Sequence, residues 1–326
     1  MKKRKRIVWV VSGLTLLVLI FLVGAGNYFY NVAVNRSKES IQLHGGSEDR
    51  AETVSTTVEE EQQQQERLAE IMEWTEKQTF ETIEMKSGDG LSLKADYLAN
   101  EKPNGKAVIL AHGYKGNSEQ MPGVTMFYYE QGFDILKPNA RGHGESEGDY
   151  IGYGWHDRKD YEQWIKLLIN EKGKSQILLH GFSMGAATVL MTSGEDLPQE
   201  VKGVIADSGY TSVKEELSHQ LKYLYNLPAF PLMEITSAVT KVRAGYTFTE
   251  ASAIEQVKKN DLPLLLIHGD QDDLVPTAMA NELYAAAKSE KDLWIVPGAG
   301  HTEAYTVDEM KYQQKLKSFF KTAGIE

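Results

Sequence analysis

The chain has 326 residues, of which 41% are hydrophobic and 25% charged, which fits one large globular domain with extensions. Its formal net charge is -11 although Lys2–Arg6 are all basic, and so acidic a body argues against a nucleic-acid partner. The sequence contains no cysteine, which excludes disulfides, a thiolate nucleophile and cysteine-ligated metals.

The N-terminus predicts a membrane-spanning segment. A basic head (residues 1–6) precedes an apolar stretch (residues 7–26) about long enough to cross ~30 Å of hydrocarbon, and Tyr28, Phe29 and Tyr30 follow where an interfacial aromatic belt would lie. Small residues near Gly24 keep a cleaved signal peptide open as the alternative. In either case the positive-inside rule places the head in the cytoplasm and the body outside the cell, anchored or secreted.

Two segments separate this stretch from the body. Residues 27–57 are polar with little periodicity and predict a linker. Residues 58–78 are rich in Glu and Gln with a few apolar positions, and they predict an acidic helix. We expect its 59–76 portion to pack on the body or on a partner protein.

Residues 79–326 read as one α/β domain. The stretch 79–98 predicts two strands joined by a Gly-Asp-Gly turn, and six apolar runs separated by amphipathic stretches follow it. This order predicts eight strands in a mostly parallel sheet with helices on both faces. Residues 210–260 are too long for an ordinary connection and predict a small helical cap. The six further strands are expected at residues 106–112, 133–139, 175–181, 201–207, 263–270 and 292–298.

The stretch Gly181-Phe182-Ser183-Met184-Gly185 joins an apolar strand to a run of small helix formers. In that context a Gly-x-Ser-x-Gly pattern places serine on a strained turn, with its oxygen exposed above the sheet. Gly181 and Gly185 are then needed because the backbone passes too close for side chains. Ser183 is the predicted nucleophile.

A serine nucleophile needs a base, and the base needs an acid to orient it. Where the serine lies on such a Gly-x-Ser-x-Gly turn, the chain order is serine, acid, base. His301 follows the last predicted strand and is the predicted base, whereas His219 falls in the cap and His268 reads as a structural histidine. For the acid, the stretch HGDQDDLVP offers three aspartates at 270, 272 and 273, and Asp207 at the end of an earlier strand is the alternative.

An acyl-transfer site also needs donors for an oxyanion. The backbone N–H of Met184, at a helix N-terminus, is one candidate, and the N–H of Tyr114 in the loop after residues 106–112 is the second. The sequence has no phosphate-binding loop and no paired-histidine metal motif, so we expect neither a cofactor nor a metal.

Five motifs, AHGYKGN, NARGHGESEG, GFSMGAA, HGDQDDLVP and GAGH, resemble the α/β-hydrolase superfamily in order and spacing. The resemblance implies Ser183 as nucleophile, Asp272 as acid, His301 as base, and Tyr114 and Met184 as oxyanion donors. It implies a structural role for the RGHGES stretch. Three further stretches, GNYFYNVAVNRS, GYGWHDRKDYEQWI and AGYTFTEASAIEQVKK, resemble membrane-anchored or exported bacterial α/β hydrolases of ill-defined substrate.

These observations predict a serine hydrolase that cleaves carboxylic esters or related acyl bonds of a small molecule or lipid through an acyl-enzyme intermediate. A serine peptidase or a lysophospholipase of the same fold is the alternative within enzymes. A non-catalytic binding or scaffold protein is the alternative of another class, and a serine oxygen far from His301 together with no ester turnover would favour it.

Overall fold

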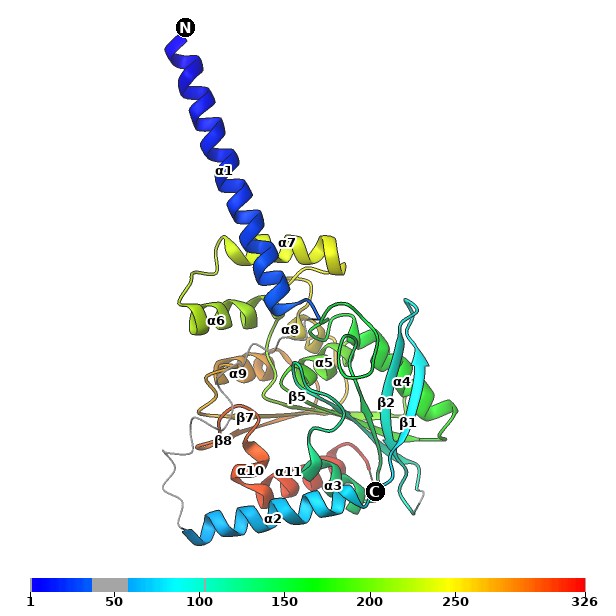
Figure 1. Cartoon of the computed structure of the whole chain (residues 1–326). Coiled ribbons are helices and arrows are strands. Elements are labelled where there is room, and N and C mark those ends of the chain that lie inside the picture. The colour runs from blue at the N-terminus through cyan, green and yellow to red at the C-terminus, as the bar shows by residue number, and fades with distance from the viewer. Residues whose placement is uncertain (1, 37–57, 103, 326) are drawn as a thin grey trace.

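The computed structural model describes residues 2–36, 58–102 and 104–325. Figure 1 shows a central sheet with helices on both sides and one long helix projecting from the body. The sheet has eight strands in the order β1-β2-β4-β3-β5-β6-β7-β8, which confirms the predicted architecture. The strands are β1 (Glu81–Lys86), β2 (Ser92–Leu98), β3 (Lys106–Ala111), β4 (Asp134–Pro138), β5 (Gln176–Phe182), β6 (Val201–Asp207), β7 (Leu264–Gly269) and β8 (Lys291–Val296).

The apolar texture of the central strands follows from their burial on both faces. Strand β2 pairs antiparallel with β1 and β4, and every later pairing is parallel. Parallel strands joined by helices have both faces covered, so β3, β5 and β7 are nearly continuous hydrophobic runs. Their carboxyl ends all meet at one edge, where such sheets place ligands.

Two helical layers cover the sheet. One hydrophobic core joins the sheet to the layer that holds the central helix after β5, and a second core joins the opposite face to the C-terminal helix. The first layer contains α4 (Asp157–Asn170), α5 (Met184–Thr192), α8 (Ala253–Val257) and α9 (Thr277–Ala286), and the second contains α3 (Pro122–Glu130), α10 (Ala304–Val307) and α11 (Glu309–Thr322).

The long connection between β6 and β7 forms the cap. Helices α6 (Val213–Tyr225) and α7 (Leu232–Ala244) lie outside the layer of α5 and α9, on the side from which the N-terminal helix projects (Figure 1). The later part of this connection returns to the body, because α8 packs directly on α5. The predicted cap at residues 210–260 is therefore formed by two helices, and its last part belongs to the main helical layer.

Helix α1 (Lys2–Ala33) is the projecting helix in Figure 1. Residues Arg4–Ala33 are long and apolar enough to cross a membrane, a property that anchors and signal sequences share. The sequence predicts a linker from residue 27, whereas the helix continues through Ala33 because this end packs on α7. A Cβ added to Gly26 would lie only 2.7 Å from Ile235 Cγ2. The rest of the predicted linker, residues 37–57, lies outside the described residues.

The prediction that Tyr28, Phe29 and Tyr30 form an interfacial aromatic belt is wrong for two of the three residues. Tyr28 is 57% exposed, but Tyr30 is buried to 3%, with the Arg243 guanidinium 4.1 Å from its ring centre. Phe29 meets the Tyr225 ring edge-on, with 5.7 Å between the ring centres. These side chains attach the end of α1 to the cap.

Helix α2 (Val58–Glu76) lies along the outer face of the second layer, beside α3 (Figure 1). Ile71 is buried, the Trp74 ring packs edge-on against Tyr129, and Arg67 forms an ion pair with Glu309 at 2.7 Å. The acidic helix thus packs on the body. Whether it also binds a partner protein stays a prediction.

Candidate active site

Ser183 occupies a strained turn between β5 and α5. Its φ of 54° and ψ of -117° lie where L residues are uncommon. The flanking glycines explain how the turn is tolerated: a Cβ on Gly181 would lie 2.1 Å from the carbonyl oxygen of Gly185, and a Cβ on Gly185 would lie 2.1 Å from that of Ala111. The turn holds the serine oxygen at the carboxyl edge of the sheet.

Loops after two other strands complete the site around this oxygen. The Nε2 atom of His301, in the loop after β8, lies 2.8 Å from Ser183 Oγ. The Nδ1 atom of the same ring lies 2.8 Å from Asp272 Oδ2, in the loop after β7. The structure therefore brings the three residues into a continuous hydrogen-bonded chain, in which the imidazole can accept the serine proton while the carboxylate fixes its orientation.

The Asp272 carboxylate is buried and well supplied with donors. The N–H groups of Leu274 and Val275 donate to Oδ1 at 3.0 and 2.8 Å, and His268 Nε2 lies 3.2 Å from Oδ2. Burial alone would raise the pKa of Asp272, but the hydrogen bonds from His268 and His301 outweigh it and hold this pKa well below its ordinary range. Asp272 is thus ionised at neutral pH.

Sequence reasoning missed the contact that His268 makes with the acid. His268 reads as a structural histidine, and its Nε2 does lie 2.8 Å from the carbonyl oxygen of Val275. It also shares Asp272 with His301, and although burial lowers its pKa, the bond to Asp272 raises it overall. The only signal in the sequence is its position four residues before the aspartate.

Asp207, the alternative acid, lies beside the chain of three residues and makes no hydrogen bond to His301 among the described contacts. Its oxygens accept hydrogen bonds from Tyr312 at 2.9 Å and Ser208 at 3.0 Å. Burial raises the pKa of Asp207 to about 6, even though both hydroxyls favour its ionised form. Its backbone carbonyl accepts from the N–H of Ser183, so this residue supports the turn.

The two candidate oxyanion donors flank the serine. Met184 is the first residue of α5, where N–H groups have no partner within the helix. The loop that carries Tyr114 approaches from the other side: a Cβ on Gly113 would lie 3.6 Å from Ser183 Cβ. His112 shapes this loop by donating from Nδ1 to the carbonyl of Gly113 at 2.7 Å.

The RGHGES stretch is structural, as the resemblance implies. The buried Arg141 guanidinium pairs with Asp160 at 2.8 Å and Asp89 at 2.9 Å. His143 accepts the N–H of Lys115 at 3.1 Å. The stretch therefore fixes the loop that carries Tyr114 rather than contacting Ser183. Among the described residues, no group of three His, Asp or Glu side chains is arranged to hold a metal ion.

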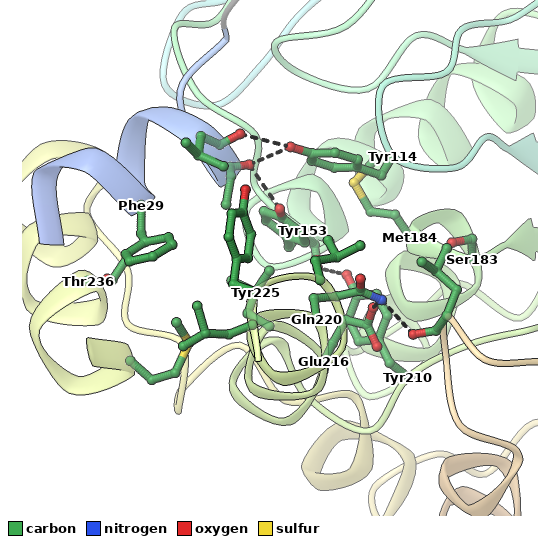
Figure 2. A pocket seen from close by; sticks show the side chains of 17 residues that line it. Phe29, Tyr114, Tyr153, Ser183, Met184, Tyr210, Glu216, Gln220, Tyr225 and Thr236 are labelled. Atoms are coloured by element: carbon green, nitrogen blue, oxygen red, sulfur yellow. Dashed lines mark hydrogen bonds between the residues drawn. The ribbon is translucent and has the colours of Figure 1, made fainter. Parts of the chain in front are cut away.

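A pocket that is open to solvent leads away from Ser183. Figure 2 shows Ser183 and Tyr210 at one end and Phe29 and Thr236 at the other, with Tyr114, Tyr153 and Tyr225 between them. Helices α1, α6 and α7 supply most of its walls. Its aliphatic and Phe lining includes Phe29, Val32, Leu217, Leu221, Leu224 and Met233.

Two polar side chains of α6 interrupt this lining. Gln220 Nε2 donates to Glu216 Oε1 at 3.1 Å and to the carbonyl of Leu274 at 2.6 Å, next to the acid. Burial raises the pKa of Glu216 to about 8, so the carboxyl is mostly protonated at neutral pH. The pocket wall therefore has little net charge at this point. Nothing in the sequence distinguished Glu216 from other helical glutamates.

The geometry agrees with a comparison against known families. The profile of the prolyl oligopeptidase family matches residues 121–324, more than half of the chain. The chain belongs to this family. Members of this family have the α/β-hydrolase fold, which the similar solved structures share. Membership of the family supports hydrolase activity for this chain.

Similar proteins were found in bacteria and archaea. The uncharacterized Bacillus subtilis protein YqkD is 28% identical over 249 residues, which cover 74% of this chain and 81% of that protein. Among solved structures, the Pyrococcus furiosus esterase Pf2001 is 24% identical with a TM-score of 0.62. The match covers 75% of this chain and 93% of the esterase. The Pyrococcus horikoshii acylaminoacyl peptidase is 20% identical with a TM-score of 0.58, over 77% of this chain and 43% of the peptidase.

Proposed function

We propose that the chain is a membrane-anchored serine hydrolase that cleaves carboxylic esters through an acyl-enzyme intermediate. The observation that carries the proposal is the unbroken chain from Ser183 Oγ through His301 to Asp272, with 2.8 Å at each step. A non-catalytic scaffold has no need of this geometry, and a serine oxygen far from the histidine would have favoured it.

The residues suit the two halves of the reaction. Ser183 Oγ attacks the ester carbonyl while His301 Nε2 accepts its proton, and the N–H groups of Met184 and Tyr114 stabilise the oxyanion. His301 returns the proton to the leaving alcohol. Water then attacks the acyl-enzyme with His301 again as base, and the carboxylic acid leaves as Ser183 regains its proton.

The apolar pocket supports an acyl chain as the group held beside Ser183. Apolar side chains of α1, α6 and α7 form a large part of its wall, and the carboxyl of Glu216 is mostly neutral at pH 7. A peptidase is the second candidate because the matching family profile is that of prolyl oligopeptidases. A peptide substrate would bring a polar backbone into this largely apolar space, which favours the ester.

For location we propose an uncleaved anchor with the basic head in the cytoplasm and the catalytic domain outside. The support is the apolar length of α1 and the basic residues that precede it. The end of this helix also packs on the cap, so the segment after the apolar stretch is an integral part of the domain.

The test is turnover by the purified full-length chain in detergent. We expect hydrolysis of p-nitrophenyl butyrate and no cleavage of a prolyl p-nitroanilide peptide, and Ser183→Ala should abolish the ester activity. Preferential peptide cleavage would transfer the assignment to the peptidase. Ester turnover that survives Ser183→Ala would exclude this serine as the nucleophile.

A further inference from the structure

The pocket beside Ser183 ends at the transmembrane helix. Phe29, Val32 and Ala33 of α1 form part of its wall, opposite α6 and α7 of the cap. The hydroxyls of Tyr114 and Tyr153, which also line the pocket, each donate to the carbonyl of Ala33 at 2.9 Å. The anchor is therefore a structural wall of the substrate site as well as a tether.

The three sequence stretches that carry the narrower resemblance meet near this wall. Tyr153 of the second stretch donates to Ala33 of the first, and the His156 ring of the second lies 5.4 Å from the Tyr246 ring of the third. The carbonyl of Val34 also accepts the N–H of Ile151 at 2.7 Å. The Arg36 guanidinium donates to the carbonyls of Gly144 and Ser146 at 2.8 and 2.7 Å. These bonds fix the position of the body relative to the end of α1.

The length of α1 leaves no spacer between the bilayer and the cap. About 20 residues are needed to cross ~30 Å of hydrocarbon, and counted from Ile7, after the basic head, they end at Gly26. Gly26 is already in close contact with Ile235 of α7. Hence α7 must lie at the membrane surface if α1 spans the membrane.

The exposed side chains of the cap fit that position. Phe230, two residues before α7, is 74% exposed, and Val242 near its end is 86% exposed. Lys241 and Arg243 flank Val242, and α7 lies at the end of the body from which α1 emerges (Figure 1). Exposed apolar side chains beside basic ones are typical of a surface that contacts lipid headgroups.

We propose that the substrate is a long-chain acyl ester taken from the bilayer, with its carbonyl at Ser183 and its acyl chain lying along the pocket toward Phe29. The proposal rests on the function proposed above and names its substrate class. The pocket runs from the nucleophile to the part of α1 next to the membrane, so an acyl chain in it stays in apolar surroundings.

The first test compares acyl lengths in the full-length chain reconstituted into phosphatidylcholine–phosphatidylglycerol vesicles. p-Nitrophenyl palmitate should be hydrolysed with a higher kcat/KM than p-nitrophenyl butyrate. One methylene in a hydrophobic pocket changes kcat/KM about tenfold or more, so Phe29→Gln should lower the palmitate-to-butyrate ratio by at least about tenfold. The matched control is Tyr28→Gln, an adjacent aromatic residue that is exposed and does not line the pocket.

The outcomes separate this proposal from the one on which it rests. If the wild-type chain hydrolyses butyrate through Ser183 but does not prefer palmitate, or if Phe29→Gln and Tyr28→Gln leave the same ratio, the bilayer-ester proposal is wrong and the esterase proposal stands. If neither ester is hydrolysed and a fluorophosphonate does not label Ser183, the proposed function itself fails.

The second test measures the depth of the cap, using the absence of native cysteine. A fluorophore on Val242→Cys should be quenched by spin-labelled phosphatidylcholine in the same vesicles. One on Lys321→Cys, in α11 on the far side of the sheet from α1, should not be quenched (Figure 1). Equal quenching at both positions, or none at Val242→Cys, would contradict a cap that lies on the membrane.

Discussion

Replacing each candidate acid by asparagine distinguishes the roles of Asp272 and Asp207. Asp272 accepts hydrogen bonds from His301 and from the N–H groups of Leu274 and Val275, and His268 Nε2 lies 3.2 Å from its Oδ2. An asparagine has one oxygen and one NH₂ group. Its NH₂ group must therefore face either the N–H groups of Leu274 and Val275 or the imidazole of His301, which are all donors. The change removes the negative charge and favours the wrong tautomer of His301.

We expect Asp272→Asn to lower kcat by about 10⁴-fold with little change in KM, as in other Ser-His-Asp triads. At about 1.4 kcal/mol per factor of ten this is about 5.5 kcal/mol of transition-state stabilisation. Asp207→Asn should cost less than about tenfold, because that carboxyl binds Tyr312 and Ser208 instead of His301. The assay is butyrate ester hydrolysis, with thermal unfolding to verify folding. A large loss from Asp207→Asn alone would refute the assignment.

Three other predictions concern stability and topology. Gly185→Ala should lower the free energy of unfolding by about 3 kcal/mol or more, because its Cβ would lie 2.1 Å from the Ala111 carbonyl oxygen. The control Gly88→Ala, whose Cβ would lie 3.6 Å from Gln163 Nε2, should be nearly neutral. An unchanged free energy of unfolding in both variants would contradict the geometry of the Ser183 turn. Burial raises the pKa of Glu216, which lies beside Gln220 and Asp272, from 4.5 to about 8. Proton binding by this carboxyl therefore stabilises the folded state fully below pH 4.5, and the contribution is lost as the pH rises through about 8. Glu216→Gln should therefore raise the unfolding temperature more at pH 8 than at pH 5, and an equal shift at both would be evidence against a raised pKa. Lys321→Cys should react with a membrane-impermeant maleimide in intact cells, and labelling only after lysis would reverse the proposed topology.

Much of the fold could be predicted because each strand carries its own local signal. Strands β3, β5 and β7 are nearly continuous apolar runs, as expected for strands buried on both faces, and each lies within two residues of its predicted position. Ser183 and His301 could be placed from the chain order of the fold. The choice of Asp272 among three nearby aspartates needed the family spacing, because all three are compatible with a turn after β7.

The walls of the pocket could not be predicted, because they depend on contacts between distant segments. Phe29 and Tyr30 have the composition of an interfacial belt, and only the contacts of Phe29 with α6 and of Tyr30 with α7 show that they face the protein. Glu216 has an ordinary helical context, and its raised pKa arises from burial between the cap and the acid loop. The hydrophobic periodicity of a sequence shows which face of a single helix is buried. It does not show which other helix packs against that face.

The most direct test of the central claim is the site of covalent labelling by a fluorophosphonate. The account predicts a single adduct on Ser183, located by mass spectrometry of the wild-type chain, because His301 Nε2 lies 2.8 Å from its oxygen and activates it. His301→Ala should slow labelling by orders of magnitude, and Ser183→Ala should remove it. An adduct on another residue, or unchanged labelling of Ser183 in His301→Ala, would contradict the account.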